Sequence, residues 1–108
     1  MDICSCIDMS LEVTNIDIDK LEKAAYILRA LAHETRLCVL MHLSQTKEKS
    51  VSDLMEELGC EQSLLSHHLT DLRAKGILNS RREGRNNFYS INNQAIVPLL
   101  ECLINYCK

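Results

Sequence analysis

The chain has little of what small domains often use to stabilise themselves. Its 108 residues contain no tryptophan, one phenylalanine, one proline and three glycines, although hydrophobic residues make up 46%. The core must therefore be built mainly from Leu, Ile, Val and Ala. A chain of this length is expected to form one domain. Its core is modest, and dimerisation would cover apolar surface that one copy leaves exposed.

Long apolar runs are missing as well. No stretch approaches the ~20 apolar residues of a membrane span. The first ten residues, MDICSCIDMS, lack the basic start and long apolar stretch of a signal peptide. We therefore expect a soluble, cytoplasmic protein with no membrane partner. There is also no Gly-rich phosphate loop, no pair of acid/base carboxylates and no nucleophile motif, so the sequence does not indicate an enzyme.

Positive charge is concentrated in one segment. The chain has a formal net charge of −3. Residues 62–91 nevertheless carry five basic and two acidic side chains, a net of +3, whereas residues 1–61 carry six basic and twelve acidic ones, a net of −6. A DNA duplex presents one negative charge per ~1.7 Å and attracts such a local basic face even on an acidic protein.

Helical spacing of apolar residues runs through the first two thirds of the chain. It predicts a helix from Asp17, a second helix after a break at Ala32-His33, and a third over 51–58. The polar run 44–50 is interpreted as a loop. Ser50 and Asp53 have the spacing of a capping box for the third helix.

A fourth helix is predicted over 62–75, with Gly76 as its left-handed C-cap. Residues 77–78 and 88–91 are interpreted as strands around a tip at Glu83-Gly84-Arg85. A last helix is predicted over about 94–107. The expected fold is mainly α with a small β-hairpin, a winged helix-turn-helix in the order α-α-α-α-β-β-α. Residues 1–16 are interpreted as a flexible N-terminal arm and 17–108 as one DNA-binding and dimerisation domain.

The helices over 51–58 and 62–75 have the spacing of a helix-turn-helix, whose second helix enters the major groove. Its outward side chains suit base and phosphate contacts. The alternative is an ordinary solvated helix, but the glycine stop and the basic hairpin after it favour DNA. The predicted DNA contacts are Gln62, Ser63, Ser66, His67, Thr70 and Arg73 on the helix, with Arg81, Arg82 and Arg85 on the hairpin. His68 shares the leucine face and is interpreted as structural.

Six cysteines are many for this length: Cys4, Cys6, Cys38, Cys60, Cys102 and Cys107. Without a secretory signal, a disulfide framework is a weak interpretation. No CxxC pair is present. Cys60 lies in the turn of the helix-turn-helix and is interpreted as a packing residue. Cys107 is either a buried interface residue on the apolar stripe of the last helix or part of a sensor.

The segments LRALAHETRLCVL, SVSDLMEELGCEQSLLSHHLTDLRAKGIL and RREGRNNFYSI resemble the ArsR/SmtB family of winged-helix repressors, over about residues 21–91. The resemblance implies a homodimer paired through the first and last helices. It also implies double-stranded operator DNA as the partner and release from it when an inducer binds. No cofactor is then required for DNA binding itself.

The sensor sites known in that family do not carry over directly. The third helix begins VSDL, without the C-x-C of the arsenic, cadmium and lead sensors. The last helix, NNQAIVPLLECLINYC, has no histidine for the zinc, nickel or cobalt site. Two hypotheses remain. A soft metal or metalloid ion joins Cys4 and Cys6 to Cys102 or Cys107, since thiolates select such ions. Alternatively, oxidation or reactive sulfur links Cys38 and Cys107.

Overall fold

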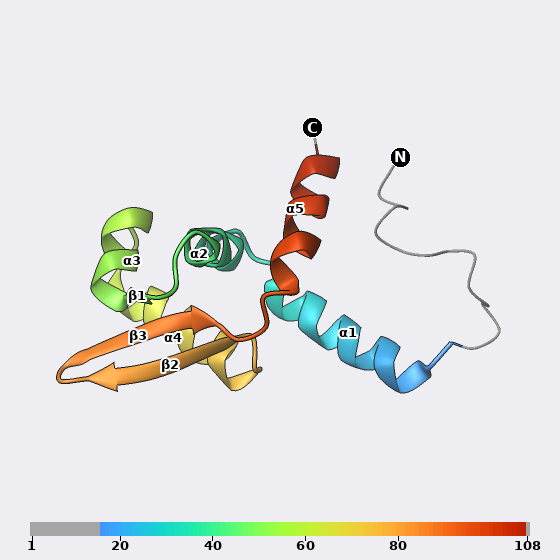
Figure 1. Cartoon of the computed structure of the whole chain (residues 1–108), viewed down its shortest axis with the longest axis horizontal. Coiled ribbons are helices and arrows are strands. Elements are labelled where there is room, and N and C mark those ends of the chain that lie inside the picture. Colours follow the sequence, from blue (N-terminus) through green and yellow to red (C-terminus); the bar gives the residue numbers. More distant parts are fainter. Residues whose placement is uncertain (1–15, 108) are drawn as a thin grey trace.

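The computed structural model describes residues 16–107. Five helices and three short strands follow one another in this range (Figure 1). They are α1 (Ile18–Leu31), α2 (Glu34–Ser44), β1 (Lys49–Ser50), α3 (Val51–Leu58), α4 (Gln62–Ala74), β2 (Leu78–Glu83), β3 (Asn86–Ile91) and α5 (Ile96–Tyr106). The predicted mainly-α fold with a β-hairpin is confirmed. The proposed arm at 1–16 falls outside the described residues except for Ile16.

One strand was not expected. The loop predicted over 44–50 ends in β1, which pairs antiparallel with β3 and gives a three-stranded sheet in the order β1-β3-β2. The hairpin strands are also longer than predicted, because β2 continues to Glu83 and β3 begins at Asn86. These added residues are exposed and polar, so no apolar alternation marks them in the sequence.

Local signals set where α3 and α4 begin and end. Ser50 Oγ accepts from the Asp53 backbone N–H, and the Asp53 carboxylate accepts from the Ser50 N–H, which confirms the capping box. Gly76 follows α4 with a φ of +79°, and Gly84 at the hairpin tip has a φ of +63°. Side chains with a Cβ rarely adopt this region, so glycine is needed at both turns.

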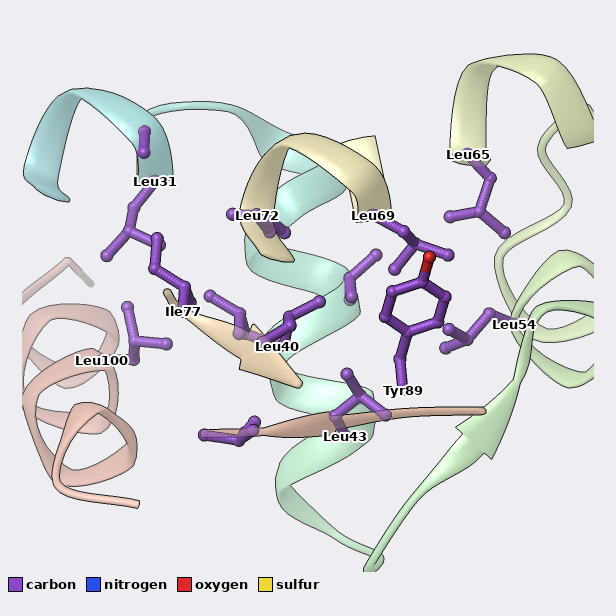
Figure 2. Packing of buried hydrophobic residues seen from close by; sticks show 14 residues of the cluster. Leu31, Leu40, Leu43, Leu54, Leu65, Leu69, Leu72, Ile77, Tyr89 and Leu100 are labelled. Atoms are coloured by element: carbon purple, nitrogen blue, oxygen red, sulfur yellow. The ribbon is translucent and has the colours of Figure 1, made fainter. Parts of the chain in front are cut away.

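The core is assembled mainly from leucine, as the composition predicted. Figure 2 shows Leu31, Leu40, Leu54, Leu69 and Leu100 converging from five different helices, with the Tyr89 ring of β3 among them. Three leucines of α4 are fully buried in this cluster. The core therefore fixes the face of α4 that points inward, and with it the face that points outward.

Helices α1 and α5 are set apart from the rest. Figure 1 shows them on one side of the molecule, while α3, α4 and the β2–β3 hairpin lie on the other. Helix α5 ends at Tyr106, so Cys107 is its C-cap, with extended backbone angles and an exposed side chain. The last helix was predicted to reach about residue 107, whereas α5 ends one residue earlier, and Cys107 is exposed in a single copy. No helix in the described range is long and apolar enough to cross a membrane.

Candidate nucleic-acid interface

Helix α4 presents a polar row opposite its buried leucines. Five of its six predicted contact residues are exposed, and Ser66 is half-buried. Glu61, the N-cap position, makes no side-chain cap with the helix, although its carboxylate accepts from the Ser63 hydroxyl at 3.3 Å. The outward face thus offers short hydroxyl, amide and imidazole groups on a rigid helix. Such groups can read base edges and phosphates.

The tip of the hairpin and the start of α4 meet at a polar hollow of about 280 Å³. The predicted contacts Gln62, Ser66 and Arg85 all line it. Its other lining residues are Val51, Ser52 and Met55 of α3 with Asn86 and Asn87 of β3. Two predicted pieces of the interface, the helix and the hairpin, are therefore adjacent. A phosphate of the DNA backbone can contact the helix and the hairpin at once.

The three hairpin arginines are in different states. Arg85 makes no ion pair within the described range. Arg82 donates from Nε to the Gly84 carbonyl at 3.2 Å and has no acidic partner in the described part of the chain. Arg81 instead is paired with Glu48 and Glu83, and these hydrogen bonds raise its pKa further above its ordinary value. Two carboxylates thus offset the charge of Arg81, unlike that of its neighbours.

A second polar cluster lies beneath α4. Asp71 accepts from Lys75 Nζ at 2.6 Å and from Arg36 Nη1 of α2 at 2.8 Å. The hydrogen bond from Lys75 is the main reason that the pKa of Asp71 is lowered, and Arg36 adds to it. The same guanidinium donates to the Ala30 carbonyl at the end of α1. This arginine therefore connects α1 and α2 to the recognition helix.

His68 completes that cluster and is structural, as predicted. It is 4% exposed, and its Nδ1 accepts from Arg36 Nε at 2.9 Å. The His33 ring lies against it at 4.4 Å between centroids. Burial lowers the pKa of His68, and the charges of His33, Arg36 and His67 lower it further. The buried Nε2 has no hydrogen-bond partner in the described part of the chain. The lowered pKa and the hydrogen bond from Arg36 both favour the neutral form of His68.

The cysteines do not converge on one site within the described residues. Cys38 of α2 and Cys107 are free and exposed, and Cys60 is free and packs half-buried against the core, as predicted. Cys102 is half-buried on α5. Cys4 and Cys6 lie outside the described residues. Over positions 16–107, no group of three His, Cys, Asp or Glu side chains is placed to hold a metal ion.

Three polar residues that line the hollow were not predicted from the sequence: Ser52, Asn86 and Asn87. The predicted contacts were the outward face of the fourth helix and the arginines of the hairpin. Glu48 was missed because it lies in the segment interpreted as a plain loop. Its partner Arg81 is 33 positions away. The missing signal was strand β1, and two residues are too few to give a period.

Comparison with known proteins agrees with this geometry. A family model described as "Bacterial regulatory protein, arsR family" matches residues 33–80. The HTH-type transcriptional regulator YgaV of Escherichia coli strain K12 is 36% identical over 87 residues, covering 80% of this chain and 88% of its own length. The transcriptional activator HlyU of Vibrio cholerae is 38% identical over 87 residues, 80% of each chain.

Solved structures show the same fold. HlyU from Vibrio cholerae superimposes with a TM-score of 0.73 at 37% identity, covering 82% of this chain and 97% of that one. A structure described as reduced HlyU gives 0.73 at 36% identity, with coverage of 83% and 95%. The transcriptional repressor PagR of Bacillus anthracis gives 0.71 at 32% identity, with coverage of 81% and 99%.

The chain is more than 30% identical to these regulators over about four fifths of its length and shares their fold. Its helix-turn-helix and basic hairpin lie at the expected positions. Family members are regulators that bind DNA and not enzymes. The chain therefore belongs to the arsR family of bacterial regulatory proteins and is a winged-helix, DNA-binding transcriptional regulator.

Proposed function

We propose that the protein is a dimeric repressor that binds operator DNA and is released by an inducer sensed through cysteines. The observation that carries the DNA-binding part is the exposed polar row of α4 beside a wing with two unneutralised arginines. In this proposal Gln62, Ser63, Ser66, His67, Thr70 and Arg73 enter or flank the major groove. Arg82 and Arg85 contact the backbone or the minor groove. The protein works in the cytoplasm, where its operator lies.

Direct base reading is tested on the middle of α4. The operator is first obtained by selecting duplexes from a random pool. Ser66→Ala and His67→Ala should each weaken binding to the selected duplex by about fivefold or more, since a lost base contact costs about 1–3 kcal/mol. Binding to random duplex should change much less. Gln94→Ala, in the exposed loop before α5, is the matched control. Equal losses on both duplexes would show that these side chains do not read bases.

The dimer is proposed from the exposed apolar side chains of the terminal helices. Leu21 and Leu28 of α1 and Leu99, Leu103 and Ile104 of α5 all remain exposed in one copy. A groove of about 410 Å³, lined by Ile27, Ile77, Ile96 and Leu99 among others, lies between these helices. Contiguous apolar surface of this kind marks an interface. A two-fold dimer presents two recognition helices to successive major grooves.

The sensor is proposed to involve the end of α5. Cys107 is free and exposed at the C-cap, next to the proposed interface. A soft metal or metalloid ion held by Cys107 with Cys4 and Cys6 is the first hypothesis, because thiolates select such ions. A thiol switch using Cys38 and Cys107 is the second. The free, exposed state of both thiols favours it, and a relative has been characterised in a reduced form.

One variant tests the sensor in either form. Cys107→Ser should fold, dimerise and bind operator, yet fail to release it with the inducer. Coupling of this kind typically changes operator affinity ~5–150-fold, so release is measured as the loss of bound duplex on adding Zn(II), Cd(II), As(III), persulfide or oxidant. Mass spectrometry then identifies a bound ion or a new sulfur bond. Cys60→Ser is the control for loss of a thiol. Normal release of Cys107→Ser by every agent would remove Cys107 from the sensor.

A further inference from the structure

One side-chain contact between the wing and the segment before β1 has no role in the assignment above. Arg81 lies on β2, and its guanidinium reaches across the sheet to Glu48, which immediately precedes β1. Nε lies 3.1 and 3.0 Å from the two Glu48 oxygens, and Nη2 lies 2.5 Å from Oε1. This is a two-pronged pair, the geometry in which arginine fixes a carboxylate most specifically.

The path of this side chain follows the strand register. Phe88 of β3 pairs with Arg81 on one side and with Ser50 of β1 on the other. Directly opposite side chains of antiparallel strands share one face of the sheet. The Arg81 guanidinium therefore lies over the Phe88 ring, with Cζ 4.6 Å from the ring centroid, before it reaches Glu48. The three strands are tied together at this level.

The tie lies next to the polar hollow. Arg85, Asn86 and Asn87 immediately precede Phe88 and line the hollow, and Ser52 follows Ser50 by two residues on its other side. A change in the angle between hairpin and α3 therefore widens or closes it. The Arg81–Glu48 pair joins the hairpin to the segment before β1, and it also offsets the charge of Arg81. The Arg81 side chain is 51% exposed and the Glu48 side chain is 32% exposed. Water therefore reaches both groups, and the ion pair can open and re-form.

We infer that Arg81 is a positioning residue for DNA binding and not a DNA contact: with Glu48 it sets the wing so that Arg85 and the start of α4 grip one backbone phosphate. The inference rests on the proposed DNA-binding role of the wing. According to this inference, Glu48 favours DNA binding although its own charge is repelled by DNA. It also divides the wing arginines into one that positions and two that contact.

The direction in which one substitution changes DNA affinity distinguishes a positioning role of Arg81 from a DNA contact. Removing a negative charge near DNA ordinarily strengthens binding. Glu48→Gln should instead weaken binding to the selected duplex by about fivefold, the scale of losing one exposed but well-oriented ion pair. Glu83→Gln is the matched control, because it removes the same charge and the other partner of Arg81 but leaves the wing tied to the β1 segment. Its binding should be unchanged or tighter.

Rescue by charge exchange is the second measurement. Arg81→Glu alone should weaken binding, and the double variant Glu48→Arg with Arg81→Glu should recover most of the lost affinity. Thermal melts of each variant check that it is folded. If Arg81 contacts a phosphate, Glu48→Gln will bind as tightly as the parent or more so, and the double variant will bind as poorly as Arg81→Glu. Either result overturns the inference. If the parent itself binds no duplex from the pool, the proposed function fails instead.

Discussion

At the scale of single residues, the most constrained side chain is His68. Its Nδ1 accepts from Arg36, so its proton lies on Nε2, and that atom is buried without a partner in the described range. Protonating Nδ1 would remove the hydrogen bond and place a cation beside the Arg36 guanidinium. Sequence spacing predicted the burial of His68. It did not predict Arg36, because a pair 32 positions apart follows no local rule.

This arrangement predicts a pH-dependent stability. The pKa of folded His68 is lowered from its ordinary 6.5, so its contribution is complete above pH 6.5 and is lost as the pH falls through the folded pKa. His68→Asn keeps an acceptor near Nδ1 but does not titrate. We expect the free energy of unfolding, measured by urea titration between about pH 5 and 8, to fall less steeply in this variant than in the parent.

The control for that measurement is an exposed side chain that does not titrate. Gln94→Ala, in the loop before α5, should keep the pH slope of the parent. Identical slopes in the parent and His68→Asn would show that another group, such as Asp71, sets the acid limit of stability.

At the scale of elements, the turns were predictable and the strands only in part. Gly76 and Gly84 marked the two turns in the sequence, because glycine is strongly preferred where φ is positive. Both turns lie where they were expected. Strand β1, all of β2 after Leu78 and the first two residues of β3 were missed, because exposed strands of a wing have no apolar face to produce alternation. The end of α5 was placed one residue too late, which changed the environment of Cys107.

The exposed arginines of the wing predict how DNA affinity depends on salt concentration. Arg82→Ala and Arg85→Ala should each weaken binding to duplex DNA with little loss of stability, because both side chains are exposed. Each lost phosphate contact should reduce the slope of log affinity against log salt by ~0.9. Affinities measured across a series of NaCl concentrations give this slope.

The matched control for the wing is Arg29→Ala, an equally exposed arginine at the end of α1. Its slope should equal that of the parent. If the slope is also unchanged in both wing variants, the wing does not touch the DNA backbone, and the recognition helix alone carries the electrostatic attraction.

At the scale of the whole molecule, the chain divides into an acidic half and a basic face. The net of −6 over residues 1–61 keeps that part of the chain away from a polyanion, while the +3 of residues 62–91 turns the interface toward it. The sequence gives this division directly, since charge needs no structure to be counted. The pairing through the first and last helices was implied only by the family resemblance. The structure adds that one copy leaves apolar side chains of α1 and α5 exposed.

The dimer prediction belongs to this scale. Leu103→Glu places a charge on the exposed apolar face of α5 and should weaken the dimer by about tenfold or more, since each fully buried leucine contributes about 1.5–3 kcal/mol. Sedimentation over a range of protein concentrations measures the change. Leu64→Glu, an equally exposed leucine on α4, is the control and should remain dimeric. An unchanged dimer in Leu103→Glu would move the interface away from α5.

Ser50 has a consequence for how any signal travels. Ser50 ends the strand beside the wing and also caps the first helix of the helix-turn-helix, so we expect the wing and this helix to move together. Each DNA-binding half of the proposed dimer is then expected to move as one rigid body. The proposed inducer, acting at α5, would change the distance between the two halves but not the shape of either half. We therefore expect operators that differ in half-site spacing to differ in their response to the inducer, while operators that differ only in sequence within a half-site respond alike.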